Sequence, residues 1–172
     1  MEIKLKSMLN SLFSPRGKQL FQEGLTLSKL GRYEDAISFF DQALELSPNY
    51  PEALVNKGKS LTNLGRYGEA ITCFDKTLDL SPRNIDAWFC KGLALFYQEK
   101  YDQAIYYFDN VLSVYPDDVN TWLEKGSALF YQDKYEEAVR CFDRVLSLDP
   151  RHEAARCNRE DSVAALEKKS LR

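Results

Sequence analysis

The sequence lacks most of the features that enzymes, metalloproteins and membrane proteins need. It has one histidine, His152, and no nucleotide-binding, zinc-protease or serine-hydrolase motif, so we expect no catalytic function, no cofactor and no metal. No stretch approaches the roughly 20 apolar residues of a membrane helix. The net charge is only −3 and no basic block is present. This composition argues against nucleic acid as a partner, and a membrane is not expected either.

Cysteine is also scarce. The four cysteines are Cys73, Cys90, Cys141 and Cys157. They lie too far apart for a C-x-x-C zinc or redox site and are too few for a disulfide scaffold. We interpret them as small apolar side chains in a reducing compartment. The N-terminal segment lacks the continuous apolar core of a secretory signal, so the protein is predicted to be cytoplasmic.

The information in the sequence lies in its periodicity. Four prolines follow one another at a spacing of 34 residues and divide the chain into four repeats, 17–50, 51–84, 85–118 and 119–152. Position eight of every repeat is glycine, position seventeen tyrosine, position twenty alanine and position twenty-four phenylalanine. The recurring residues are Gly24, Gly58, Gly92 and Gly126; Tyr33, Tyr67, Tyr101 and Tyr135; Ala36, Ala70, Ala104 and Ala138; and Phe40, Phe74, Phe108 and Phe142.

Each repeat is predicted to form two helices. Apolar residues recur at helical spacing in both halves, and the proline ends the second helix. Gly31 and Gly65 permit a left-handed turn between the helices of the first two repeats. In the third and fourth repeats this position is Glu99 and Asp133. A left-handed backbone costs a residue with a side chain about 1 kcal/mol, so we expect another turn geometry in these two repeats. One helix pair cannot bury its apolar face alone, so the repeats must stack.

These positions resemble the tetratricopeptide repeat family over 136 of the 172 residues, that is, four repeats of 34. The resemblance implies an all-α, right-handed superhelical solenoid of antiparallel helix pairs. Position seven, usually leucine in the family, is lysine in three repeats, and position twenty-five is aspartate in all four. The residues are Lys57, Lys91 and Lys125, and Asp41, Asp75, Asp109 and Asp143. Ion pairs between adjacent repeats are one hypothesis, and independently solvated charges are the other.

Both ends of a stack expose apolar faces unless something covers them. Residues 153–172 are predicted to form a C-terminal capping helix. Residues 1–16 carry an apolar stripe and are predicted to form an N-terminal capping segment. A self-association surface and a weak membrane-surface helix are the alternatives for this stripe. The stripe comprises Met1, Leu5, Met8, Leu9, Leu12 and Phe13.

The resemblance also implies a concave groove lined by positions two, five, six, nine, twelve and thirteen of the first helices. The candidate residues for binding a partner are Val55, Asn56, Lys59, Asn63, Phe89, Leu93, Phe96, Tyr97, Asn120, Leu123, Phe130 and Tyr131. Packing between neighbouring first helices is the alternative role for Phe89, Phe96, Leu123 and Phe130. Tyr97 and Tyr131 are the strongest candidates, because a tyrosine can bury its ring and keep its hydroxyl in water.

One branch of the family grips the C-terminal carboxylate of heat-shock chaperones with lysine, asparagine and arginine side chains. Here Phe21 and Leu25 replace the first lysine and asparagine, Asp86 and Cys90 replace the last lysine and arginine, and only Asn56 matches. We therefore predict a non-catalytic protein–protein interaction scaffold that binds a peptide or helix of another protein and is not such a clamp. The alternative is a self-assembly module that forms homo-oligomers through its end faces or N-terminal helix.

Overall fold

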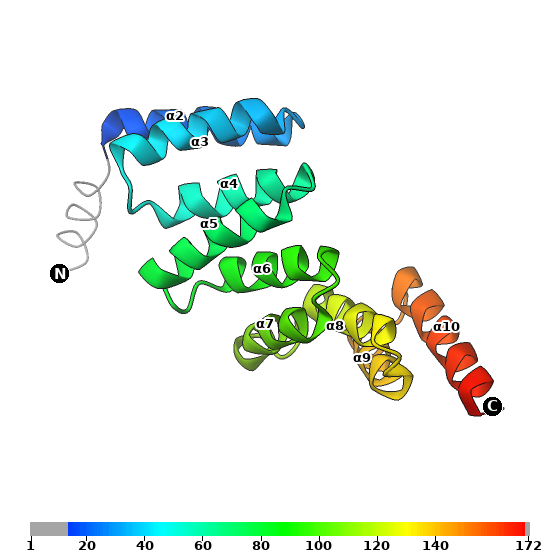
Figure 1. Cartoon of the computed structure of the whole chain (residues 1–172). Helices are drawn as coiled ribbons and strands as arrows, with labels where there is room; N and C mark the ends of the chain where they lie inside the picture. The colour runs from blue at the N-terminus through cyan, green and yellow to red at the C-terminus, as the bar shows by residue number, and fades with distance from the viewer. Residues whose placement is uncertain (1–13, 171–172) are drawn as a thin grey trace. The chain divides into compact units, whose positions relative to one another are not determined.

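The structure is a computed structural model that describes residues 14–170, so the predicted N-terminal stripe lies outside the described residues. Between 14 and 170 the chain forms helices joined by short turns, with no strand (Figure 1). The helices are α2 (Pro15–Lys29), α3 (Tyr33–Leu46), α4 (Pro51–Asn63), α5 (Tyr67–Leu80), α6 (Ile85–Tyr97), α7 (Tyr101–Val114), α8 (Val119–Tyr131), α9 (Tyr135–Leu148) and α10 (Glu153–Ser170).

The chain divides into two compact units, Met1–Cys90 and Lys91–Arg172, whose boundary falls within α6. In the first unit, α2 packs against α3 and α4 against α5, and α3 also contacts α4. In the second unit, α8 packs against α9, α7 contacts α8, and α10 contacts α9 and, more lightly, α8. Each predicted repeat therefore supplies one pair of helices, and α10 follows the last pair as a single helix.

The first helices of the repeats begin with different local chemistry. Pro15 and Pro51 start α2 and α4, where the missing N–H of proline costs no helical hydrogen bond. Before α6, the Asn84 side chain accepts a hydrogen bond from the Ala87 N–H at 2.9 Å. Asp118 does the same before α8, and His152 Nδ1 accepts from the first turn of α10 at 3.2 Å. The one histidine of the sequence thus serves as a helix cap.

The turn between the two helices of a repeat is left-handed in all four repeats. The φ angle is +74° at Gly31 and +73° at Gly65, and it stays positive at Glu99 (61°) and Asp133 (58°). The prediction of another geometry for the last two repeats is therefore wrong. The reason lies in the hydrogen bonds, because the residue after each turn donates back to the helix it leaves, as from Lys100 N–H to the Leu95 carbonyl at 2.9 Å.

The second helices end where the prolines require it. α3, α5, α7 and α9 each end two residues before the proline of their repeat, because a residue preceding proline avoids helical backbone angles. The described residues thus confirm this part of the prediction.

The core of each repeat is one phenylalanine ring held against one glycine. Phe40, Phe74, Phe108 and Phe142 are fully buried, as are the alanines at position twenty. A Cβ atom added at Gly58 would lie 2.5 Å from the Phe74 ring, and the three equivalent glycines would each meet their phenylalanine at 2.6 Å. Such distances are below van der Waals contact, so the absent side chain is what admits the ring.

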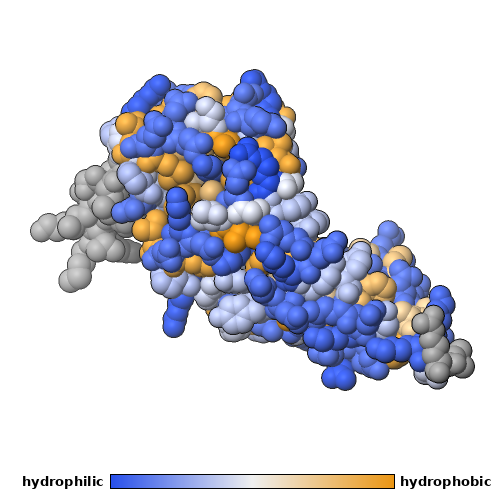
Figure 2. All heavy atoms as spheres, viewed as in Figure 1, coloured by the Kyte–Doolittle hydropathy of each residue, from blue (hydrophilic) through white to orange (hydrophobic). Residues whose placement is uncertain are grey.

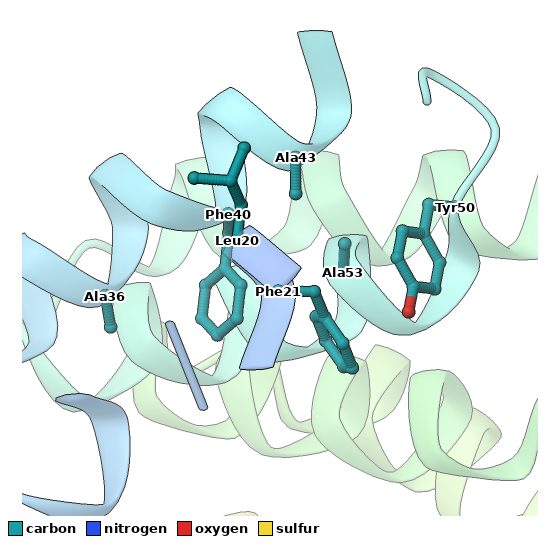
Figure 3. Packing of buried hydrophobic residues seen from close by; sticks show 7 residues of the cluster. All are labelled: Leu20, Phe21, Ala36, Phe40, Ala43, Tyr50 and Ala53. Atoms are coloured by element: carbon teal, nitrogen blue, oxygen red, sulfur yellow. The ribbon is translucent and has the colours of Figure 1, made fainter. Parts of the chain in front are cut away.

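Figure 3 shows this packing in the first repeat. Leu20 and Phe21 from α2, Phe40 from α3 and Tyr50 before α4 form one buried cluster. The Phe21 ring lies 5.9 Å from that of Phe40 and 4.9 Å from that of Tyr50, and both pairs are tilted. Tilted pairs at these distances are favourable for aromatic rings. The first helix of this repeat thereby packs against the segment that leads into α4.

Replacing Gly58 with alanine tests the glycine–phenylalanine contact. We expect the free energy of unfolding to fall by about 1–3 kcal/mol, because the Phe74 ring must move to admit the methyl group. Gly68 is exposed on α5 and is the matched control. Gly68→Ala should leave stability unchanged or raise it by up to about 1 kcal/mol through helix propensity. Urea unfolding followed by circular dichroism measures both, and equal effects would contradict the explanation.

The left-handed turns give a second test. An alanine Cβ at Gly65 meets no atom within 4 Å, so Gly65→Ala reports backbone strain alone and should cost about 1 kcal/mol. Glu99→Gly removes the same strain and should stabilise the protein by up to about 1 kcal/mol, less the entropy that glycine adds to the unfolded chain. Thermal unfolding measures the difference, and a destabilised Glu99→Gly variant would show that the side chain is needed at the turn.

Candidate functional site

The candidate binding residues lie on the first helices of the repeats, and the structure separates buried from accessible ones. On the face shown in Figure 2, polar side chains predominate and apolar residues show between them. Val55 is 3% exposed and Phe21, at the same repeat position, is buried in the cluster of Figure 3. The expectation that Val55 lines an open groove is wrong, because position five points into the packing of the helices in these repeats.

Three polar candidates of the second repeat already have partners. The Asn56 side-chain amide donates to the Glu52 carbonyl at 2.8 Å. The Asn63 amide donates to the Lys59 carbonyl at 2.9 Å, so both asparagines bond their own helix. The Lys59 ammonium pairs with Asp86 at 3.2 Å, a contact between neighbouring repeats. A ligand at these positions would have to compete with these bonds.

The aromatic candidates of the last two repeats form a cluster around Tyr131. The Tyr131 ring stacks on Tyr101, the first residue of α7, with centroids 5.6 Å apart and an angle of 11° between the planes. Phe96 and Phe130 approach the same ring edge-on at 5.7 and 5.8 Å. Tyr131 nevertheless stays 61% exposed. The cluster therefore holds a large aromatic side chain rigidly while leaving much of its surface open.

The remaining apolar candidates divide into packed and accessible residues. Leu123 and Phe130 are partly buried against the cluster around Phe142, in accord with the alternative role of packing. Phe89 and Leu93 are likewise half-buried. Tyr97 is 54% exposed and meets Phe96 edge-on at 5.6 Å. Asn120 is exposed. Among the predicted aromatic residues, Tyr97 and Tyr131 present the most accessible surface.

Ion pairs connect adjacent repeats away from the candidate binding residues. Lys57 pairs with Asp41 at 2.5 Å and Lys125 with Asp109 at 2.6 Å, which confirms the hypothesis for these two pairs. The series continues into α10, where Arg159 pairs with Asp143 at 2.5 Å. All are partly exposed, so each contributes on the order of 0–1 kcal/mol.

The three buried cysteines carry no sign of reactivity. Burial raises the pKa of the Cys90 and Cys141 thiols to about 11 and also raises the pKa of Cys73, while Cys157 is exposed. A raised pKa keeps a thiol protonated and unreactive at neutral pH. Within 14–170, no group of three or more histidine, cysteine or acidic residues is arranged to hold a metal ion. The same range contains no helix long and apolar enough to cross a membrane.

Glu124 on α8 is an acidic residue in an unfavourable position for its charge. Its side chain is half-buried, and burial raises the pKa of its carboxyl group. No cation of the described residues lies within 4 Å of it. The ionised carboxylate is therefore a cost to the fold at neutral pH.

A pocket between α8 and α10 includes two residues that sequence reasoning missed. It has a volume of about 150 Å³ and is lined by Ser127, Phe130, Tyr131, Phe142, Asn158 and Asp161. Asn158 and Asp161 stand at positions six and nine if the repeat frame is continued past residue 152. Continuing the repeat frame past residue 152 would have identified both residues, because positions six and nine are predicted groove positions in the four complete repeats.

Comparison with known proteins decides the family. A family model described as "Anaphase-promoting complex, cyclosome, subunit 3" matches residues 29–111 and again residues 67–145, together well over half of the chain. The chain belongs to this family of tetratricopeptide repeat sequences. No curated protein sequence matches it significantly.

Solved tetratricopeptide repeat structures share the fold. MamA, from residue 41 onward, from Desulfovibrio magneticus RS-1 is 23% identical with a TM-score of 0.79, over 91% of this chain and 94% of that one. YrrB, described as having an unusual peptide-binding site, is 26% identical with a TM-score of 0.74 over 86% and 76%. The first such domain of Spaghetti (RPAP3), bound to an HSP90 peptide, is 27% identical with a TM-score of 0.65 over 68% and 93%. These matches confirm the predicted class of helix-pair solenoid.

Glu124 makes the stability of the repeats depend on pH. Because its pKa is raised in the folded state, the folded protein gains stability as pH falls through that raised value, and the penalty is present at pH 7. Glu124→Gln should therefore raise the melting temperature at pH 7 by a few degrees at most, and this gain should disappear near pH 4. Scanning calorimetry at the two pH values measures it. Glu160→Gln, on the exposed side of α10, should show no such dependence.

Proposed function

We propose that this tetratricopeptide repeat chain is a non-catalytic protein–protein interaction scaffold whose first helices bind a peptide segment or amphipathic helix of another protein. The observation that carries the proposal is Tyr131, which is held by three aromatic neighbours and still 61% exposed. A rigid, accessible aromatic ring loses little entropy when a partner covers it. The structural relatives support the proposal, since YrrB is described with a peptide-binding site and the RPAP3 domain holds a peptide.

The peptide in question is not expected to be a chaperone tail held through its carboxylate. The clamp positions carry buried Phe21, buried Cys90 and Asp86, and the last of these adds a negative charge where a cation is required. Lys59, the nearby cation, is paired with Asp86. A terminal carboxylate would find repulsion and no free donor at these positions.

Self-assembly is a second candidate, favoured by the end face of the first repeat. A pocket of about 430 Å³ lies on α2 and α3, where the half-buried Leu27 and Phe39 lie among polar and charged residues. Leu30, just after α2, is exposed. Apolar residues on an end face can receive another copy of the chain. Light scattering over a range of concentrations separates the two functions, because a steady monomer leaves only the partner-binding one.

Peptides selected from a random display library against the purified protein test the binding surface. Tyr131→Ala should weaken the selected peptides by roughly 1–3 kcal/mol, since the ring is the expected anchor. Tyr106→Ala is the matched control, because Tyr106 is also 61% exposed but lies on α7, a second helix. Calorimetric titration measures both affinities, and circular dichroism confirms that each variant is folded.

Two results would contradict the proposal. One is a selection that enriches no binding peptide. The other is a set of enriched peptides that lose affinity with Tyr106→Ala and keep it with Tyr131→Ala and Tyr97→Ala. The second result would place recognition on the second helices.

A further inference from the structure

The pocket between α8 and α10 combines aromatic rings with a carboxylate. Phe130 and Tyr131 come from the end of α8, and Asn158 and Asp161 lie one turn apart on α10. The stacked contact with Tyr101 occupies one face of the Tyr131 ring, and the ring also borders this pocket. Glu124 lies one turn before Ser127 on α8 and adds a second carboxylate on the same side of the helix.

The charge of Asp161 is not neutralised within the described part of the chain. No cation there lies within 4 Å of its carboxylate. In the second repeat the residue at the same position is Lys59, whose charge is met by Asp86 of the next repeat. Arg159, the cation nearest to Asp161 in the sequence, is paired with Asp143.

We propose that this pocket receives a lysine or arginine side chain of the partner segment, with the cation beside the Tyr131 and Phe130 rings and paired with Asp161. The inference rests on the proposed function and names the chemistry that the partner must present. An aromatic face attracts a cation, and a carboxylate beside it adds direct pairing. A cavity of about 150 Å³ is large enough for a molecule the size of benzene, so the end of one long side chain fits.

The chain uses the same contact within itself. The Lys169 ammonium lies 5.6 Å from the centre of the Tyr135 ring and donates to the Asp133 carbonyl at 3.2 Å. Tyr135 in turn packs edge-on against Phe130, a ring of the pocket, at 5.4 Å. A lysine thus already binds an aromatic ring next to the pocket, and this contact leaves the carboxylate of Asp161 for another cation.

Short blocked alanine peptides with one central lysine, arginine, norleucine or glutamate test the pocket directly. The readout is the saturable shift of the amide signals of Ser127, Asn158 and Asp161 in nuclear magnetic resonance spectra of the full chain. We expect the lysine and arginine peptides to shift these signals, and added salt to weaken the effect. The norleucine peptide has the same length without the charge and should bind several-fold more weakly, and the glutamate peptide should not bind.

Asp161→Asn should weaken the lysine peptide by about threefold to tenfold. Glu160→Gln removes a neighbouring exposed carboxylate on α10 and should leave the affinity unchanged. Equal binding of norleucine and lysine, an unaffected Asp161→Asn variant, or the absence of a saturable shift at these signals would each overturn the inference.

The test separates this inference from the proposed function. If library peptides lose affinity with Tyr131→Ala but the lysine probe leaves the pocket signals unchanged, the scaffold function stands and the cation pocket is wrong. If the lysine probe binds with the expected dependence on Asp161 while library peptides ignore Tyr131, the pocket stands and the wider binding surface is wrong.

Discussion

The close approach of a phenylalanine ring to a helix without a side chain governs the rest of this structure. In each repeat the ring at position twenty-four occupies the space that a Cβ at position eight would need, at 2.5–2.6 Å. Two helices can therefore pack tightly around one large apolar group, and the fully buried alanines at position twenty complete the crossing. Because the pair still has apolar faces on either side, the next pair must cover it, and stacking follows from the same contact.

This packing tolerates backbone strain in the turns of the last two repeats, which the sequence alone did not predict. Glu99 and Asp133 keep the left-handed turn of Gly31 and Gly65, although each costs about 1 kcal/mol. The turn bonds two backbone N–H groups to the preceding helix, and it aligns the second helix so that the phenylalanine meets its glycine. Another turn geometry would lose both the hydrogen bonds and this alignment, which costs more free energy than the backbone strain.

The recurring core residues leave the surface of the helices free to vary, and a few buried positions vary as well, such as Ala43, Thr77 and Val111. The first helices show the consequence. In the second repeat the polar side chains on that surface already have partners within the protein. Two asparagine amides donate to carbonyls of their own helix, and Lys59 pairs with Asp86. At the fourth repeat and α10 it carries an exposed tyrosine, a half-buried Glu124 and Asp161, which has no cation within 4 Å among residues 14–170. A partner can bind most favourably to side chains that remain exposed or unpaired within the fold.

The sequence by itself determined the helix pairs, their order and their ends before the prolines, because these depend on periodicity and on residues at fixed spacing. It left ion pairs between repeats as one of two hypotheses, and the structure decided for pairing at Lys57 and Lys125. It also identified Tyr97 and Tyr131 as accessible aromatic residues. Only the tertiary structure decided that Val55 is buried, that Asn56 and Asn63 bond their own helix, and that Asp161 and Tyr131 line the same pocket. The physical reason is that burial and pairing depend on which side chains a neighbouring helix supplies, and a repeat pattern specifies the position of that helix without specifying its contacts.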